Sequence, residues 1–219
     1  MSNEITLIVC IAGVGLIGKE LVAQLNENHA ALRCERGIHI RIVGLASTTR
    51  LVLCPDDASR TSAIGTQAHT SAEVASALAA CASAAAVPHD ILHALGRHVL
   101  AQTEAEAATR GASAVPVLVD CTAGAATAHH MLDWMRSGIR IVTCNKQFAA
   151  GDAGRFASAM ALVRTRQSMY FHEATVGAGM PVISTLKHLR ATGDQMRCVQ
   201  GILRCVCCDS VYCVLVAES

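Results

Sequence analysis

Three glycines near the start of the chain have a spacing that lets a protein backbone hold a phosphate group. Gly13, Gly15 and Gly18 follow the pattern G-x-G-x-x-G. In such a turn the first glycine bends the chain, the second leaves room for a pyrophosphate beside the backbone, and the third lets the next helix pack closely. The positive amino end of that helix attracts the phosphates. The pattern alone also suits a tight turn that serves packing only.

The residues on both sides of the glycines favour the phosphate-binding interpretation. An apolar run before the turn has the character of a buried strand, and apolar residues after it recur at helical spacing. The run is Ile5, Leu7, Ile8, Val9 and Ile11, and the helical positions are Leu16, Ile17, Leu21, Val22 and Leu25. A strand, a glycine turn and a helix in this order predict a dinucleotide-binding unit. We therefore expect an α/β fold of the Rossmann type, with a doubly wound, mostly parallel sheet.

The end of the next predicted strand, residues 39–46, bears on the choice of cofactor. A fold that prefers NAD places an acidic residue there to bind the ribose hydroxyls. This chain instead continues with Ser47, Thr48, Thr49 and Arg50. Hydroxyl groups and a guanidinium suit a 2′-phosphate, so we expect NADP, or both NADP and NAD, with Ser47 and Arg50 at the cofactor. The alternative is an ordinary solvated loop.

The composition indicates a small-molecule partner. The 219 residues carry a formal net charge of +1, so there is no basic field for nucleic acid and no polybasic anchor for a membrane. The amino terminus has no leader pattern, and no apolar run is long enough to span a bilayer. The 11 cysteines, most of them scattered singly, suit a reducing compartment. We therefore expect a soluble, cytoplasmic protein.

The middle of the chain is rich in alanine and histidine. Residues 71–86 have strong helix propensity but little bulk, which predicts a peripheral helix. His89 and His93 stand at a spacing that suits a metal pair, with His98 nearby, yet no third ligand of suitable spacing follows. A solvated helix face is the expectation here.

Two further predicted strands end in residues that can do chemistry. Residues 115–120 lead into the small and polar segment 120–124, and residues 138–145 lead into Lys146. Ligands of open α/β sheets bind at the carboxyl ends of the strands, so both segments are expected at the ligand. Lys146 is either a surface charge or a group that donates to a substrate carbonyl oxygen or relays a proton.

Another predicted strand and helix frame a loop with oxygen donors. The strand spans residues 169–174, and the helix begins at Pro181 and ends at a turn around Gly193. Between them the Glu173 carboxylate and nearby main-chain carbonyls could hold a hard cation, although one carboxylate makes a weak site. His172 is expected to be packed or solvated.

Several segments of the chain have a combination of residues that is typical of one enzyme family. They are VDCTAG at 119–124, IRIVTCNK at 139–146, EATVGAGMPVISTLKHL at 173–189, TGDQM at 192–196 and GI at 201–202. Together these segments resemble homoserine dehydrogenases, from about residue 5 to residue 202 and most weakly across the alanine-rich middle. The resemblance implies NAD(P)-dependent interconversion of L-homoserine and L-aspartate 4-semialdehyde, a step of threonine and methionine biosynthesis.

The resemblance also implies roles for single residues. It implies that the glycine turn binds pyrophosphate and that Thr122 and Ala123 lie along the nicotinamide ribose, with Ala123 where the family often has serine. It implies that Lys146 helps to bind substrate or to move the proton, and that a carboxylate and main-chain oxygens hold a sodium ion. The turn comprises Gly13, Val14, Gly15, Leu16, Ile17 and Gly18, and the sodium site comprises Glu173, Val176 and Ala178.

The chain departs from the family after residue 202. There the family continues into a substrate domain with an acidic residue for substrate and the Asp and Lys central to catalysis. The expected organisation here is an NAD(P)-binding domain at 1–168, the truncated start of an α+β substrate domain at 169–202, and a divergent cysteine-rich tail at 203–219. The tail cysteines do not match a paired zinc framework, and residues 211–216 are expected to make or extend a strand.

Two functions stay open from the sequence. One is an oxidoreductase of the homoserine dehydrogenase type, which Lys146 beside the nicotinamide-side loop favours. The other is a truncated, catalytically impaired NAD(P)-binding protein or regulatory module, which the missing substrate-domain acid and lysine favour. A truncated sheet would expose an edge and apolar surface, so self-association, for example as a homodimer, is also expected.

Overall fold

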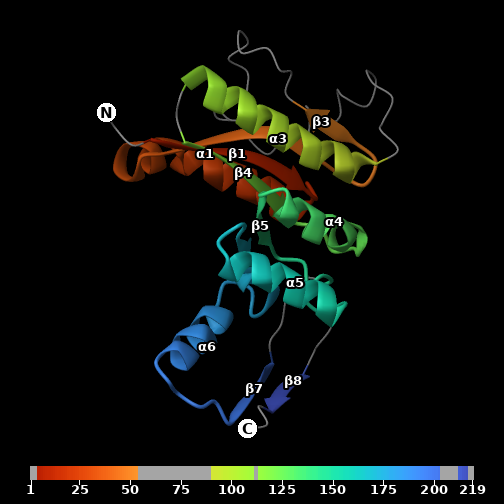
Figure 1. Ribbon diagram of the computed structural model, residues 1–219, viewed down its shortest axis with the longest axis vertical. Coiled ribbons are helices and arrows are strands. Elements are labelled where there is room, and N and C mark those ends of the chain that lie inside the picture. Colours follow the sequence, from red (N-terminus) through yellow and green to blue (C-terminus); the bar gives the residue numbers. More distant parts are fainter. Residues whose placement is uncertain (1–3, 54–89, 111–112, 203–211, 217–219) are drawn as a thin grey trace.

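The computed structural model describes residues 4–53, 90–110, 113–202 and 212–216, and its main body is a six-stranded sheet with helices on both faces (Figure 1). The strand order is β3-β2-β1-β4-β5-β6, and every neighbouring pair is parallel except β2 and β3. This arrangement confirms the predicted doubly wound, mostly parallel sheet. The strands are β1 (Ile5–Ala12), β2 (Ile38–Ala46), β3 (Leu51–Leu53), β4 (Ser113–Asp120), β5 (Arg140–Thr143) and β6 (Tyr170–Phe171).

Among the described residues, one helix packs on one face of the sheet and three pack on the other. Helix α1 (Leu16–Arg36) packs on one face, where Val22 meets alternate residues of β1, β2 and β4. Helices α3 (Ile91–Arg110), α4 (Ala126–Arg136) and α5 (Ala153–Arg164) pack on the other face. The central strands are buried on both sides, which explains their nearly continuous apolar sequences.

The apolar stripe of α1 begins one turn later than the sequence predicted. Leu16 is 92% exposed and Ile17 38% exposed, whereas Leu21, Val22 and Leu25 join the core. The first turn of α1 begins beyond the carboxyl end of β1, where no strand of the described residues lies beneath it to bury those two side chains.

Helix α3 contributes more to the core than its alanine-rich sequence suggested. Leu95 and Val99 are fully buried, and α3 contacts β1, β2 and β4. His93 is exposed, as expected for a solvated helix face. The predicted peripheral helix at 71–86 and His89 lie outside the described residues.

The two central strands approach each other closely at one point. Cys10 of β1 lies opposite Gly44 of β2, next to a register shift between Val9 and Cys10. A Cβ atom on Gly44 would lie only 2.7 Å from Cys10 Sγ and 3.0 Å from Leu95 Cδ1. The fully buried thiol therefore fills the space that a side chain at position 44 would need.

The last part of the described chain departs from regular strand geometry. The predicted strand at 169–174 is only two residues long, and a 3₁₀ turn (Glu173–Thr175) follows it. Helix α6 (Val182–Ala191) ends at Gly193, which has a φ of +86° and donates to the Arg190 carbonyl at 3.1 Å, as predicted for a glycine cap. Strands β7 (Cys198–Ile202) and β8 (Tyr212–Val216) form a separate antiparallel pair, which confirms the predicted C-terminal strand.

The six-stranded sheet extends past the expected domain boundary at residue 168. Strand β6 pairs in parallel with β5, so residues through Phe171 belong to the sheet. The division into domains stays a prediction.

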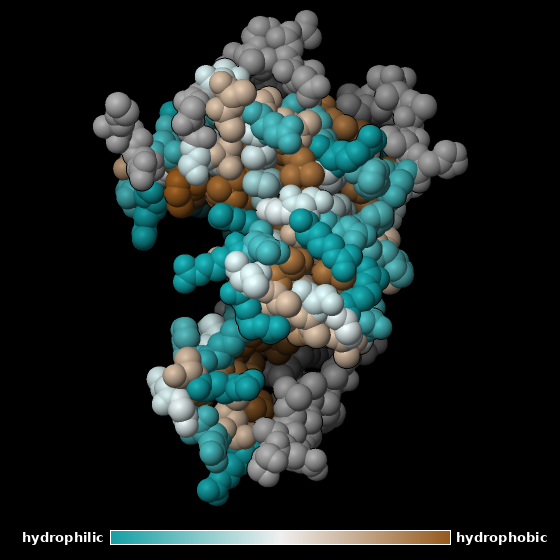
Figure 2. Space-filling view, in the orientation of Figure 1, coloured by the Kyte–Doolittle hydropathy of each residue, from teal (hydrophilic) through white to brown (hydrophobic). Residues whose placement is uncertain are grey.

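Apolar side chains stay exposed where α1 does not cover the sheet. Val142 of β5 is 38% exposed and Phe171 of β6 is 54% exposed, while their neighbours Ile141 and Tyr170 are buried beneath the helices of the other face. On the side drawn in Figure 2, hydrophilic residues alternate with smaller apolar areas. Within the described ranges, no helix combines the length and the apolar character needed to cross a membrane.

We expect Gly18→Ala to lower the free energy of unfolding by about 1–3 kcal/mol, because the added Cβ would lie 2.3 Å from the Gly13 carbonyl oxygen. Urea denaturation measures this change. Gly124→Ala is the matched control: its Cβ would meet nothing within 4 Å, so stability should change by less than about 0.5 kcal/mol. Equal stability of the two variants would contradict the close approach at Gly18.

Candidate functional site

The glycine turn combines two crowded positions with one open position. Gly13 has a φ of +90°, and a Cβ on it would lie 2.7 Å from the carbonyl carbon of Cys121. Gly18 is equally crowded by the turn itself. A Cβ on Gly15, in contrast, would meet no atom of the described residues within 4 Å apart from its chain neighbours. Gly13 and Gly18 are therefore needed for the close packing of the turn, whereas Gly15 borders space that the described residues leave open.

The amino end of α1 is suited to an anion. Gly15 is its N-cap residue, and no side chain of the described chain caps this end. The first backbone N–H groups of a helix lack partners within the helix and carry its positive partial charge. A phosphate group fits the open space at Gly15 both in size and in charge.

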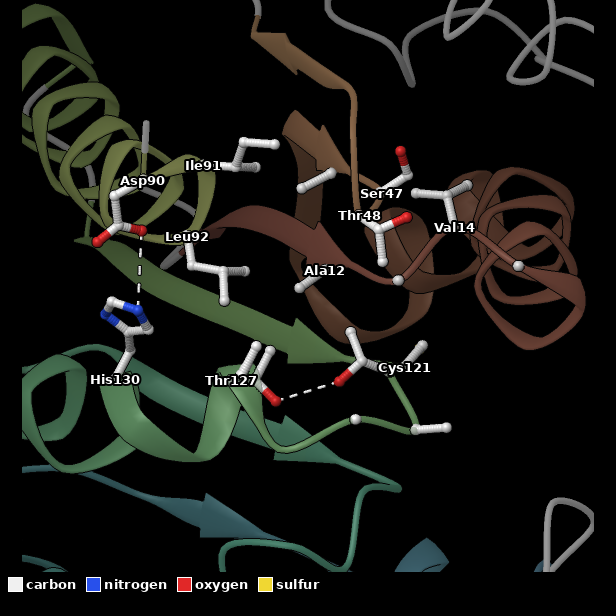
Figure 3. A pocket seen from close by; sticks show the side chains of 17 residues that line it. Ala12, Val14, Ser47, Thr48, Asp90, Ile91, Leu92, Cys121, Thr127 and His130 are labelled. Atoms are coloured by element: carbon white, nitrogen blue, oxygen red, sulfur yellow. Dashed lines mark hydrogen bonds and ion pairs between the residues drawn. The ribbon is translucent and has the colours of Figure 1, made fainter. Parts of the chain in front are cut away.

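A pocket of about 730 Å³ extends from this turn along the carboxyl ends of β1, β2 and β4 (Figure 3). Its volume is in the range of ligand-binding pockets. Mostly small and apolar residues line it, with Asp90 and His130 at the end away from Val14. The lining residues are Ala12, Gly13, Val14, Gly15, Ala46, Ser47, Thr48, Asp90, Ile91, Leu92, Cys121, Thr122, Ala123, Gly124, Ala126, Thr127 and His130.

The floor of the site is organised by the carboxyl group of Asp120, which is fully buried. Its Oδ1 accepts hydrogen bonds from the Thr122 N–H at 3.0 Å and from the Thr122 hydroxyl at 2.6 Å. Its Oδ2 accepts from the hydroxyls of Thr127 at 2.9 Å and Thr143 at 3.2 Å. A buried carboxyl group needs such partners, and here they come from the segment after β4, from α4 and from β5. The segment after β4 is thus held in one conformation.

Asn145 extends this network to the end of β5. Its Nδ2 donates to the Thr122 hydroxyl at 2.9 Å, to the Gly124 carbonyl at 2.8 Å and to the Thr127 hydroxyl at 3.2 Å. Asn145 is 5% exposed, and the half-buried Lys146 follows it directly. The position of Lys146 is therefore tied to the 122–124 segment across the sheet.

Two cysteines face each other at the next position of the same two strands. The thiol of Cys121 is hydrogen-bonded to Cys144, which lowers the pKa of Cys144 from its usual value to about 7. The same contact, burial and the nearby charges raise the pKa of Cys121. Both cysteines are free. Cys144 is accordingly the nucleophilic thiol of the pair.

We expect the alkylation rate of Cys144 by iodoacetamide to rise with pH and to reach half its plateau near pH 7, because only the thiolate reacts and the pKa of Cys144 is about 7. Peptide mass spectrometry after timed labelling separates Cys144 from the other cysteines. Cys121→Ala removes the hydrogen bond and should move the midpoint to higher pH. An unchanged midpoint in this variant would contradict the assigned cause.

The structure brings together only some of the residues that the sequence singled out. Six of them line the pocket: Gly13, Val14, Gly15, Ser47, Thr122 and Ala123. Leu16, Ile17, Gly18, Arg50 and Lys146 lie outside its lining. The site roles of all these residues stay predictions.

The segment after β2 forms a closed turn. Ser47 Oγ accepts a hydrogen bond from the Arg50 N–H at 3.0 Å, and the Ser47 N–H donates to the Arg50 carbonyl at 2.8 Å. The turn leads directly into the antiparallel strand β3. Arg50 is exposed, while Ser47 and Thr48 reach the pocket.

Several lining residues were not predicted as ligand contacts. Asp90, Ile91 and Leu92 come from the start of α3, and Thr127 and His130 come from α4. The sequence signal available was their place at the amino ends of helices that pack against the sheet, and it does not distinguish a lining residue from a solvated one.

In the loop proposed as a cation site, the carboxylate of Glu173 has a structural role. Glu173 accepts hydrogen bonds from the Ser184 N–H at 2.9 Å and 3.2 Å, and so caps the start of α6. Gly177 and Ala178 both have positive φ, at +72° and +54°, which folds the loop back on itself. The described residues contain no group of three His, Cys, Asp or Glu side chains that could hold a metal ion.

His172 beside this loop is packed, as expected. Its ring stacks on Tyr170 with centroids 4.9 Å apart, and its Nε2 lies 3.2 Å from Lys187 Nζ. Burial, followed by the Lys187 charge, lowers the pKa of His172.

The strand order and the glycine turn at the amino end of α1 define a dinucleotide-binding domain of the Rossmann type. The chain belongs to the homoserine dehydrogenase family: the family model of the homoserine dehydrogenase NAD-binding domain matches residues 13–173. The resemblance seen in the sequence is thereby confirmed.

Relatives of the chain carry the name of this family, and solved structures share its fold. The chain is 34% identical over 200 residues to bifunctional aspartokinase/homoserine dehydrogenase 1, chloroplastic, from Zea mays, covering 91% of this chain and 19% of the relative. It is 40% identical over 104 residues to homoserine dehydrogenase from Emericella nidulans, covering 47% of this chain and 28% of the relative. A protein of unknown function from Candida auris superposes with a TM-score of 0.64 at 26% identity, covering 90% of this chain and 47% of that one.

The fold is also that of a hyperthermophilic archaeal homoserine dehydrogenase solved in complex with NADPH. The TM-score is 0.54 at 16% identity, over 83% of this chain and 48% of that one. This chain thus spans about a fifth of the plant relatives and about half of the solved neighbours.

Proposed function

We propose that this chain is the NAD(P)-binding part of a homoserine dehydrogenase, which interconverts L-homoserine and L-aspartate 4-semialdehyde. The proposal rests on the open space at Gly15. This space lies at the uncapped amino end of α1 and at one end of a pocket whose volume is in the range of ligand-binding pockets. Membership of the family supports the choice of reaction. The NADPH complex of the archaeal neighbour supports the choice of cofactor.

The residues that we propose to hold the cofactor line the pocket or border it. Backbone N–H groups from Gly15 to Ile17 would bind the pyrophosphate, because those of Gly13 and Val14 already donate to the Ala46 carbonyl. Thr122 and Ala123 would lie along the nicotinamide ribose. The turn from Ser47 to Arg50 would meet the other ribose, where a guanidinium and hydroxyl groups favour NADP. Fluorescence titration with NADPH and with NADH measures this preference, and tighter binding of NADH would contradict it.

The chemistry needs a hydride acceptor and a group that handles the substrate proton. When bound, the nicotinamide ring supplies the exchange of hydride. Lys146 is the group on this chain that we assign to the substrate oxygen, either holding it or relaying its proton. Asp120 is unsuited to that task, because it is fully buried and both of its oxygens accept hydrogen bonds.

Gly15→Val should abolish measurable NADPH binding while leaving the fold intact. Its isopropyl group would enter the space left for the pyrophosphate, where no protein atom lies within 4 Å of the Cβ. NADPH fluorescence titration and a thermal melt give the two readouts. Gly179→Val is the matched control, since a Cβ there also meets nothing within 4 Å and Gly179 does not line the pocket. Unchanged affinity in Gly15→Val would remove the basis of the proposal.

A second candidate is a protein that binds NAD(P) without turning over homoserine. The described residues offer few groups that could take or give the substrate proton, which favours this candidate. Asp120 is not one of them, because its oxygens already accept hydrogen bonds from Thr122 and Thr143. The 219-residue chain should accordingly bind NADPH and show very low or no homoserine oxidation. Absorbance of reduced cofactor with homoserine and NADP measures the activity.

Lys146 variants separate the two candidates. If turnover is detected, Lys146→Ala should abolish it, and Lys146→Arg should keep NADPH affinity but not the rate, because arginine holds its proton. Turnover that survives in Lys146→Ala would show that another group handles the proton.

Further assignments are proposals of the same standing. We propose a nucleotide-binding domain that extends through Phe171 instead of ending at residue 168, a sodium site at Glu173, Val176 and Ala178, self-association through exposed apolar surface, and a cytoplasmic location. Limited proteolysis tests the domain boundary, and the sodium dependence of thermal stability tests the sodium site. Sedimentation velocity tests self-association, and imaging of the tagged protein tests the location. A monomer at all concentrations would contradict self-association.

A further inference from the structure

The pocket has a polar end that the pyrophosphate and the riboses do not explain. From the glycine turn it passes Ser47 and Thr48 and ends at Asp90 and His130, with Ile91 and Leu92 on one wall (Figure 3). Lys146 and the end of β5 do not line it. The end of β2 marks the ribose of the adenosine half in this fold, so adenine is the part of NAD(P) that we place at the polar end.

The geometry of Asp90 leaves one oxygen free for a ligand. Oδ1 accepts a hydrogen bond from the His93 N–H at 2.8 Å and lies 3.7 Å from His130 Nε2. Oδ2 accepts no hydrogen bond from the described residues. The Asp90 side chain is 50% exposed, so a base in the pocket can reach it.

The carboxylate is held from two sides. Its bond to the His93 N–H caps the start of α3, which fixes the backbone of Asp90. The ring of His130 is itself fixed by stacking on the buried Trp134, with centroids 5.4 Å apart and planes 21° apart. A pre-positioned acceptor of this kind selects a ligand by what it can donate.

We propose that Asp90 is a specificity residue that accepts a hydrogen bond from the exocyclic amine of adenine, and that His130 positions its carboxylate. This inference rests on the proposed NAD(P) binding. Adenine offers an amine donor at its 6-position, whereas a 6-oxopurine offers a carbonyl acceptor there, which a carboxylate repels. The small side chain of Ala126 and the apolar wall at Ile91 and Leu92 suit the flat faces of a purine.

The test compares NADPH with its hypoxanthine analogue, in which the 6-amine is replaced by a carbonyl oxygen. Both carry the same reduced nicotinamide, so fluorescence titration of the full chain gives both dissociation constants. The wild type should bind NADPH about tenfold more tightly than the analogue, the size expected for one hydrogen bond to a charged group. In Asp90→Asn this ratio should fall to about one, because a carboxamide can donate as well as accept.

Two further variants make the result specific. Asn is also a good N-cap, so Asp90→Asn should keep α3 intact. Asp133→Asn is the control: Asp133 lies on α4, is 73% exposed, pairs with Arg136 and does not line the pocket, and its ratio should equal that of the wild type. His130→Phe can still stack on Trp134 but lacks the contact to Asp90, so it should lower the ratio partway.

The outcomes separate this inference from the proposed function. If Asp90 and His130 only tether α3 to α4, their variants will weaken both dinucleotides equally and leave the ratio unchanged, which overturns the inference alone. A wild-type ratio of one also overturns it alone. If the wild type binds neither dinucleotide, the proposed function fails and the inference fails with it.

Discussion

The geometry of the site depends on one buried carboxyl group. Asp120 has no contact with solvent, and the cost of burying it is offset only because four hydrogen bonds reach its two oxygens. Those donors come from three places in the sequence, so satisfying the group fixes the end of β4, the start of α4 and the end of β5 together. Thr122, and through Asn145 also the backbone before Lys146, take their positions from this requirement.

The glycine turn is fixed by close contact with the backbone that follows Asp120. The backbone after Asp120 passes so close to Gly13 that no side chain fits between them. The floor of the pocket is thus formed by two backbones in contact, one from β1 and one from β4, and neither can shift without the other. The turn after β2 and the start of α3 are held differently, by short-range hydrogen bonds to Ser47 Oγ and to Asp90 Oδ1. The floor of the pocket therefore depends on contacts between distant segments, whereas these two walls depend on local ones.

The sequence predicted those elements whose structure depends on the residues next to each other in the chain. The glycine turn, the central strands and the glycine cap at Gly193 were predictable because spacing and residue type determine them. The exposure of Leu16 was not, since it depends on where the sheet ends beneath α1. The network around Asp120 was not predicted either: its threonines lie 2, 7 and 23 residues away, and only the strand register brings Thr143 to the carboxyl group. Asp90 and His130 are 40 positions apart and meet only through the packing of α3 against α4.

The contact between Cys10 and Gly44 has a consequence for how the sequence of this core can change over time. A side chain at position 44 is excluded while the thiol of Cys10 occupies the space opposite, and Leu95 restricts the same space from α3. Replacing Cys10 by alanine would remove the nearest contact, and only afterwards could position 44 accept a methyl group with a small shift of Leu95. The order of the two substitutions is therefore imposed by the packing. Homologous chains should vary at these two positions jointly, with a small residue at one wherever the other is larger.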